Sequence, residues 1–209
     1  MTATDTKNSY HHGDLHASLL KAATAIIAEA GVEGLSMRKL ADRVGVSRTA
    51  PYHHFRDKQA LLSELAISGF REFTTEVDSI AANDQLDAGA KLEAFVRFYL
   101  KFAMGQPEVY NLMFGQSIWK SGEPSQHLIE EGHAAFRRFV ELVEQWQLEG
   151  TIPSGCEPLR YAQVAWSSLH GLCRLAIDGI YADASSVDAV SDTLIQLLRQ
   201  QLGAGAEPV

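Results

Sequence analysis

The sequence is poor in cysteine, with only Cys156 and Cys173 among 209 residues. The two form no Cys-x-x-Cys pair and no histidine cluster lies beside them, so they suggest neither a zinc site nor a disulfide framework. No apolar run approaches the length of a membrane span, and residues 1–10 lack the apolar core of a signal peptide. We therefore expect a cytoplasmic protein without a cofactor, a metal or a membrane segment, with Cys173 in the core and Cys156 in a loop.

Catalytic groupings and strand patterns are missing as well. We find no paired carboxylates, no nucleophile next to a base, and no Gly-rich phosphate loop. Glu130 and His133 share a helix face, but two ligands do not make a metal site. No stretch alternates with the period of a β-strand, which predicts an all-α fold. The alternative function is that of an all-helical enzyme whose aromatic pocket performs chemistry, and turnover assays would test it.

Positive charge is scarce overall but concentrated in one stretch. The chain carries 18 Lys and Arg against 26 Asp and Glu, a net charge of −8. Residues 36–58 reverse that balance, with Arg38, Lys39, Arg43, Arg48, Arg56 and Lys58 against Asp42 and Asp57. A basic island on an acidic protein predicts a localised phosphate-binding surface. The alternatives are the solvated face of a helical hairpin and a helical interaction protein with no role on DNA.

The same stretch has the pattern of a helix-turn-helix, at about residues 36–55. An apolar stripe at helical spacing consists of Met37, Leu40, Ala41 and Val44. Ser36 suits the N-cap of this helix and Gly45 the left-handed residue that ends it. Ser47 is positioned to cap a second helix. Two helices joined by a short Gly-containing turn predict that the second lies in a DNA major groove.

A first helix and an arm precede this motif. Asp14 is a candidate cap for a helix over residues 15–30, which Gly31 ends. We expect residues 1–12 to form a flexible arm, in which Lys7, Tyr10 and His11 are weak candidates for contact with the DNA backbone. The DNA-binding domain is thus expected to span residues 13–60.

Residues 61–202 read as a second, wholly helical domain. Asp57 caps a long helix that continues to about residue 82 without a Pro or Gly break, which makes it a stiff connection to the DNA-binding end. The further helices are expected at 86–104, 107–114, 125–148, 159–178 and 187–202, with loops at 115–124 and 153–158. The tail, 203–209, is expected to be disordered.

The last two expected helices differ from the others. The helix at 159–178 is apolar on two faces, and the helix at 187–202 carries an almost heptad-like apolar seam. Two such helices can pair with their copies as a four-helix bundle, which predicts a homodimer. The alternative is that both helices complete the core of a monomer.

Three segments carry a family resemblance. Tyr-His-His-Gly-Asp-Leu at 10–15, Gly-Val-Ser at 45–47 and Ala-Pro-Tyr-His-His-Phe-Arg-Asp-Lys at 50–58 resemble the N-terminal domain of the tetracycline-repressor-like (TetR) family of bacterial transcriptional regulators. The C-terminal part resembles a subgroup with a Trp-His-Gly signature, here Trp166, His170 and Gly171. The resemblance implies an all-helical homodimer that represses transcription at an inverted-repeat operator until a small effector enters its C-terminal pocket.

Within the motif, the second helix is expected at about 47–55. Arg48 and Thr49 stand at its N-terminal end, where side chains reach bases, and Arg can pair bidentately with guanine. Tyr52 and His53 are the next outward positions and are expected to contact phosphates. Pro51 lacks an N–H and disfavours helical geometry in the residue before it, so the helix is expected to start after Ser47 or to have an altered first turn.

Lys58 breaks a local rule. A cation in the first turn of a helix faces the positive end of the helix dipole. A DNA phosphate at that position would be bound by both the lysine and the free backbone N–H groups. Arg38 receives the same assignment. The candidate DNA-binding residues are therefore Arg38, Ser47, Arg48, Thr49, Tyr52, His53 and Lys58.

The C-terminal domain is rich in aromatic residues that would suit an effector pocket. His170, one turn from Trp166, and Gln116 are candidate polar groups within it. The candidate ligand-binding residues are Tyr99, Phe102, Phe114, Trp119, Phe136, Trp166 and His170. Each of them is also compatible with an ordinary core position, and His170 with a histidine that is satisfied in the core.

Overall fold

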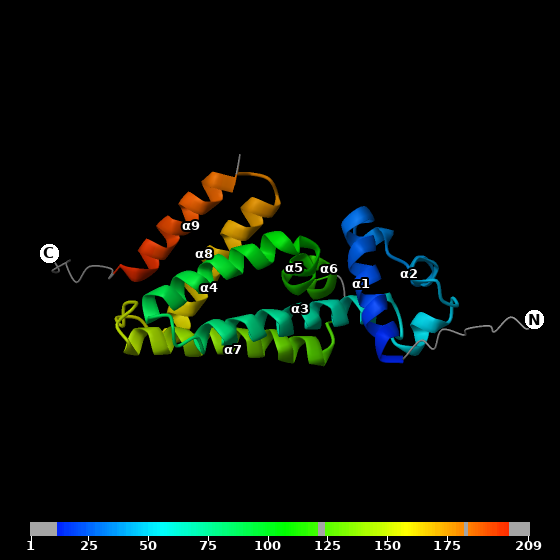
Figure 1. The fold of residues 1–209 in the computed structure, drawn as a ribbon, viewed down its shortest axis with the longest axis horizontal. Helices are drawn as coiled ribbons and strands as arrows, with labels where there is room; N and C mark the ends of the chain where they lie inside the picture. The colour runs from blue at the N-terminus through cyan, green and yellow to red at the C-terminus, as the bar shows by residue number, and fades with distance from the viewer. Residues whose placement is uncertain (1–11, 121–123, 182–183, 201–209) are drawn as a thin grey trace, which may run out of the picture.

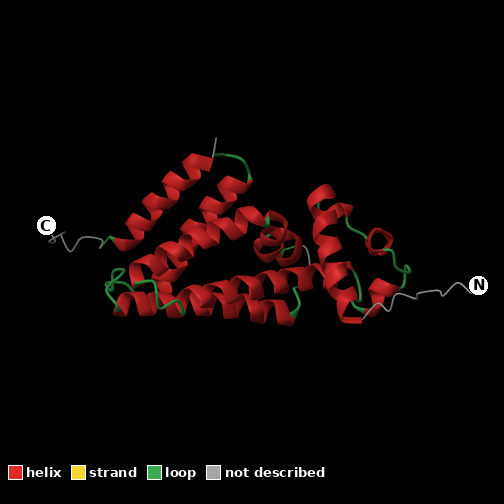
Figure 2. Ribbon diagram, viewed as in Figure 1, coloured by secondary structure: helices red, strands yellow, loops and turns green. Residues whose placement is uncertain are grey.

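The computed structural model describes residues 12–120, 124–181 and 184–200. That part of the chain is helical and contains no strand, which confirms the predicted all-α class (Figure 2). The elements are α1 (His12–Ala30), η1 (Val32–Gly34), α2 (Met37–Val44), η2 (Ala50–His53), α3 (Lys58–Ala81), α4 (Ala88–Gly105), α5 (Pro107–Phe114), α6 (Gln116–Trp119), α7 (Gln126–Leu148), α8 (Pro158–Ile177) and α9 (Ala184–Arg199).

The long helix α3 joins the two ends of the molecule. Figure 1 shows α1 and α2 gathered at one end, and α3 running from there beside α7 into the larger helical part. Helices α4, α5 and α8 cover the remaining sides of that part, and α9 packs against α4 and α8. One continuous hydrophobic core extends from Leu19 and Leu40, through Leu61 of α3, to Leu169 of α8.

Side-chain caps start several of the helices. Ser36, Asp57 and Ser125 each accept a hydrogen bond from the backbone N–H three residues later, at 3.2, 2.8 and 3.2 Å. These bonds satisfy one of the free N–H groups of each first turn. The first helix is an exception, because α1 begins at His12 and Asp14 lies inside its first turn. The expectation that Asp14 is the N-cap was wrong.

Two further boundaries differ from the expected ones. The expected loop at 115–124 contains the short helix α6, whose Trp119 indole N–H donates to the Met113 carbonyl at 2.7 Å. The last helix begins three residues earlier than expected, at Ala184, and ends at Arg199. Residues 1–11, expected as an arm, and the tail 203–209 lie outside the described residues, as does the side chain of Gln116.

Within the described ranges, no helix is both long and apolar enough to cross a bilayer. The His, Cys, Asp and Glu side chains of those same ranges form no group of three or more that would hold a metal ion. Both cysteines are free thiols. Cys173 is buried, which raises the pKa of its thiol to about 12, and Cys156 is exposed.

Candidate DNA-binding surface and effector cavity

The first half of the helix-turn-helix has the predicted geometry. Met37, Leu40 and Ala41 are buried, so α2 turns its apolar stripe toward α1. Gly45 ends the helix in the left-handed region with φ of 77°, where a residue without a Cβ is favoured. Its N–H donates to the Ala41 carbonyl at 2.9 Å. The turn therefore leaves α2 at the position that the sequence indicates.

The recognition segment is shorter than the predicted helix. Instead of an α-helix over 47–55, the chain forms the 3₁₀ turn η2, which starts only at Ala50. Pro51 has no N–H, and its carbonyl accepts from the backbone N–H groups of His54 and Phe55 at 3.1 and 2.9 Å. Ser47 does not cap this turn, because its hydroxyl pairs with that of Thr49 at 3.1 Å. The altered start at Pro51 is confirmed, and the Ser47 cap was wrong.

Burial divides this segment into an inner and an outer face. Pro51 and Phe55 are buried and hold the turn against the small core, where the Phe55 ring lies 5.1 Å from that of His16. Tyr52 is 55% exposed, an unusual exposure for so large a ring. Six of the candidate DNA-binding residues are exposed and Lys58 is half-buried: Arg38, Ser47, Arg48, Thr49, Tyr52, His53 and Lys58.

Part of the basic island is neutralised within the fold. Arg43 forms a two-pronged pair with Glu29 of α1, which lowers the pKa of that carboxyl. The Ala60 backbone N–H and the Arg56 guanidinium hold the pKa of Asp57 below its ordinary value, so this cap stays charged at neutral pH. Arg43 and Arg56 are thus ion-paired within the fold. Fewer positive charges are left to attract phosphate than the number of Lys and Arg residues in the segment indicates.

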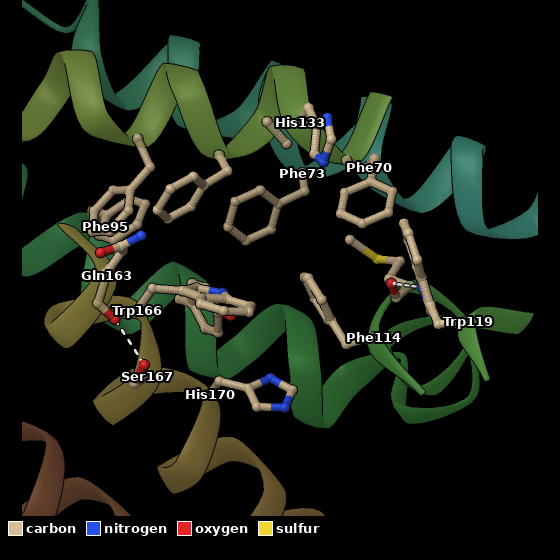
Figure 3. Close-up of a pocket in the computed structure, with 16 residues that line it drawn as sticks. Phe70, Phe73, Phe95, Phe114, Trp119, His133, Gln163, Trp166, Ser167 and His170 are labelled. Atoms are coloured by element: carbon tan, nitrogen blue, oxygen red, sulfur yellow. Dashed lines mark hydrogen bonds between the residues drawn. The ribbon is translucent and has the colours of Figure 1, made fainter. Parts of the chain in front are cut away.

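A cavity of about 620 Å³ lies inside the larger helical part, between α3, α4, α5, α6, α7 and α8 (Figure 3). Six of the seven candidate ligand-binding residues line it. The lining residues are Phe70, Phe73, Phe95, Tyr99, Met113, Phe114, Trp119, Gly132, His133, Ala135, Phe136, Phe139, Gln163, Trp166, Ser167 and His170. The volume is within the range of small-molecule sites, and the walls are mainly aromatic rings.

Phe102 is the one predicted ligand-binding residue that does not line this cavity. It is buried, and its ring packs edge-on against Phe73 and beside Phe98, so it supports the wall from behind. Phe70 and Phe73, on the apolar face of α3, also line the cavity and were not among the predicted ligand-binding residues. Their helical spacing matches an ordinary core stripe, so only the tertiary packing shows that they face a cavity.

A chain of three hydroxyl and imidazole groups borders the cavity. The Tyr99 and Tyr110 hydroxyls lie 3.2 Å apart, and the Tyr110 hydroxyl lies 2.7 Å from His170 Nδ1. Burial raises the pKa of both phenols far above its ordinary value. Burial, and then the cation of Arg174, lower the pKa of His170. All three groups are therefore neutral at physiological pH, and His170 is both hydrogen-bonded and part of the cavity wall.

Helix α5 contacts both the cavity and α3. Met113 and Phe114 line the cavity, while the α3 side of α5 crosses close to Gly69. A Cβ at Gly69 would lie 2.6 Å from Val109 Cγ1 and 2.7 Å from Met113 Sδ. Helix α5 also contacts α1, so it packs directly against the DNA-binding end.

Comparison with known proteins agrees with this architecture. Residues 19–65 match the model of bacterial regulatory proteins of the tetR family, and residues 92–198 match a tetracyclin repressor-like C-terminal domain. A tetracycline repressor of class A from Escherichia coli is 51% identical over 49 residues, which are 23% of this chain and 23% of that protein. The transcriptional repressor Rv1474c of Mycobacterium tuberculosis is 38% identical over 68 residues, 32% of this chain and 34% of that one.

The structural likeness extends over almost the whole chain. A solved protein of unknown function from Rhodococcus sp. RHA1 has 36% identity and a TM-score of 0.78, with 93% of this chain and 100% of that chain covered. By contrast, the chain spans about a quarter of the length of the tetracycline repressor that it matches. The second family model alone covers half of the chain. Together with the helix-turn-helix, these matches establish that the chain is a member of the TetR family of bacterial transcriptional regulators.

Proposed function

We propose that the protein is a homodimeric repressor that leaves an inverted-repeat operator when a small, largely apolar effector enters its cavity. One observation carries the proposal: α3 follows the helix-turn-helix directly and lines the aromatic cavity, and α5 lines the same cavity while it packs against α1 of the DNA-binding domain. A ligand that displaced Met113 or Phe114 would push on the helix that packs against Gly69. Coupling then needs only that the effector prefers one arrangement of α5 over another.

The DNA contacts follow from the outer face of the motif. Arg48 and Thr49 stand beside the exposed start of η2, where they would reach base edges, and Tyr52 and His53 follow along the same turn. Arg38 and Lys58 would bind phosphates on either side of the turn. Such a protein would act in the cytoplasm, where bacterial operators are found.

The dimer is proposed to form through α8 and α9. Exposed Val164, Ser168 and Leu175 fall on one stripe of α8, and exposed Val190 and Leu197 on one stripe of α9. Apolar side chains exposed in rows on two neighbouring helices mark a protein–protein contact. A two-fold axis there would pair each stripe with its own copy and place two motifs on two half-sites. We also assign the chain to the Trp-His-Gly subgroup, because Trp166 and His170 both line the cavity.

A salt-titrated binding measurement tests the DNA part. The protein should bind a duplex that contains the inverted repeat beside its own gene, and log K should fall linearly with log salt concentration. Binding without sequence preference, or none at low salt, would refute the repressor function. If the protein does not bind DNA but converts a candidate substrate, the alternative of an all-helical enzyme would be favoured.

The oligomeric state has its own test. Val164→Glu should give a monomer in sedimentation equilibrium, because a charge would be buried without a partner in the dimer. Leu148→Glu is the matched control, since Leu148 is 84% exposed at the end of α7, outside the proposed interface. A Val164→Glu protein that sediments as the wild type would show that α8 is not the interface.

A further inference from the structure

Most polar groups in the cavity wall are already hydrogen-bonded within the protein. The Trp119 indole N–H donates to the Met113 carbonyl at 2.7 Å, and the Ser167 hydroxyl donates to the backbone carbonyl of Gln163 at 2.7 Å. Tyr99 and His170 both bond to the Tyr110 hydroxyl. The described lining residues include no Asp, Glu, Lys or Arg. A ligand in this cavity therefore meets aromatic surface and few groups that still need a partner.

Among the described lining residues, the imidazole of His133 and the amide nitrogen of Gln163 lack such a bond, and of the two only Gln163 also borders a neighbouring hollow. The Arg160 guanidinium donates to Gln163 Oε1 at 2.9 Å, and because arginine can only donate, the contacted atom is the oxygen. This bond fixes the orientation of the amide and leaves both hydrogens of its nitrogen for another acceptor. In Figure 3 the amide nitrogen of Gln163 lies on the side of the aromatic rings, with the oxygen turned away from them.

The surroundings of Gln163 mark one polar end of the cavity. A second, shallower hollow of about 420 Å³ adjoins the first and shares Gln163 and Ser167 with it. It is lined only by residues of α8, among them Arg160, and it borders the proposed dimer interface, because Val164 and Ser168 of the dimer stripe also line it. Arg160 is held only loosely by an acidic partner, because the Glu157 carboxylate is 3.8 Å away and both side chains are largely exposed. A donor-rich mouth thus opens beside an aromatic interior.

Building on the proposed effector-responsive function, we infer that the effector has a ring-containing apolar body and, at one end, a carboxylate or carbonyl oxygen that accepts from the Gln163 amide. The aromatic interior would bury the body, and the mouth on α8 would receive the oxygen, with Arg160 behind it. An effector without an acceptor would displace water from the Gln163 amide nitrogen and offer no hydrogen bond in its place. The lost hydrogen bond would weaken binding. A cationic end would meet the Arg160 guanidinium and be repelled.

Three probes with one ring system test this inference on the full-length protein. They are 2-isopropylnaphthalene, its ketone analogue 2-acetonaphthone, and 2-naphthoate, each measured by equilibrium dialysis. Gln163→Leu should weaken the ketone about fivefold, the loss of one ordinary hydrogen bond, and leave the hydrocarbon unchanged or tighter. Gln163→Glu should act in the same direction, because it keeps the shape and the Arg160 contact but removes both donors. Gln145→Leu, a change at an exposed glutamine of α7, should change neither affinity.

The charged probe distinguishes the two sources of the oxygen. If the natural end group is a carboxylate, Arg160→Gln should weaken 2-naphthoate about tenfold and spare the ketone, because it removes the charge and retains a donor for Gln163. If the end group is a neutral carbonyl, Arg160→Gln should change both probes little. Either result supports the inference, provided that Gln163→Leu weakens the acceptor-bearing probes.

Other outcomes would overturn it. An unchanged ketone affinity in Gln163→Leu, or a loss seen only in His170→Phe, would place the polar contact elsewhere and leave the repressor function standing. Probes that bind but never alter DNA affinity would refute the effector response. If no probe binds the folded wild-type protein, both the effector cavity and the acceptor would be refuted.

Discussion

The two ends of the molecule are built on opposite plans. At the DNA-binding end, the residues proposed to act are exposed, polar and neighbours in sequence, such as Arg48, Thr49 and Tyr52. At the cavity they are mostly aromatic and are drawn from six helices, α3 to α8. The first surface is formed by one local motif, whereas the second exists only when the long helices have packed. One end therefore depends on caps and turns, and the other on tertiary packing.

The largest effect is expected at the crossing of α3 and α5, which joins the two ends. Gly69→Val would push a branched side chain into Val109 and Met113, which a Cβ alone already approaches to 2.6 and 2.7 Å. Overpacking of this kind costs about 1–3 kcal/mol, so urea unfolding should show that loss. The altered position of α5 should also change the size of the effector response on DNA.

Ser68→Val is the matched control for that change, because Ser68 is the exposed neighbour of Gly69 on the same helix. It adds the same side chain where nothing must move. If both substitutions left stability and the effector response alike, the close crossing of α3 and α5 would not be the connection between the two ends.

A smaller effect should isolate the DNA-binding end. Lys58→Ala removes one proposed phosphate contact, so it should weaken binding to all duplex sequences alike and reduce the salt slope by about one. Lys58→Arg should restore most of the slope. Arg48→Ala, in contrast, should weaken the operator more than unrelated DNA. A sequence-selective loss in Lys58→Ala would contradict its assignment to phosphate.

The same contrast explains which features the sequence predicts. Ser36, Gly45 and Asp57 act through backbone groups within three or four residues, so their roles are visible locally, and the helices that they bound were correctly predicted. The recognition segment was not, because one residue, Pro51, shortened an expected helix to a 3₁₀ turn. Pro51 indicates in the sequence that the start of this helix is altered. How far the helix is shortened depends on how the proline ring packs in the core.

The cavity could be anticipated only in part. Its aromatic richness is evident in the sequence, but Phe73 and Phe102 carry the same helical spacing and the same chemistry. One faces the cavity and the other supports it from behind, and the difference arises from where α3 and α4 meet. Gln163 was missed altogether, because an isolated glutamine on a helix has no signature in sequence. Its role becomes apparent only beside Arg160 and the cavity mouth.

The smallest expected effect is a pH dependence confined to the cavity. Burial and Arg174 lower the pKa of His170 from its ordinary value of 6.5, so the unfolded chain takes up a proton at a higher pH than the folded chain does. The contribution of His170 to stability is therefore present above that ordinary value and is lost as the pH falls below it. Urea unfolding between pH 5 and about 8 should show a steeper fall in the wild type than in His170→Gln, since the two proteins differ only in that side chain. Equal slopes would mean that the imidazole binds its proton equally well in the folded and unfolded chains, and that it is not held neutral beside Tyr110. The DNA-binding end supplies the internal comparison, because a change of slope produced by His53→Gln instead would place the pH dependence there.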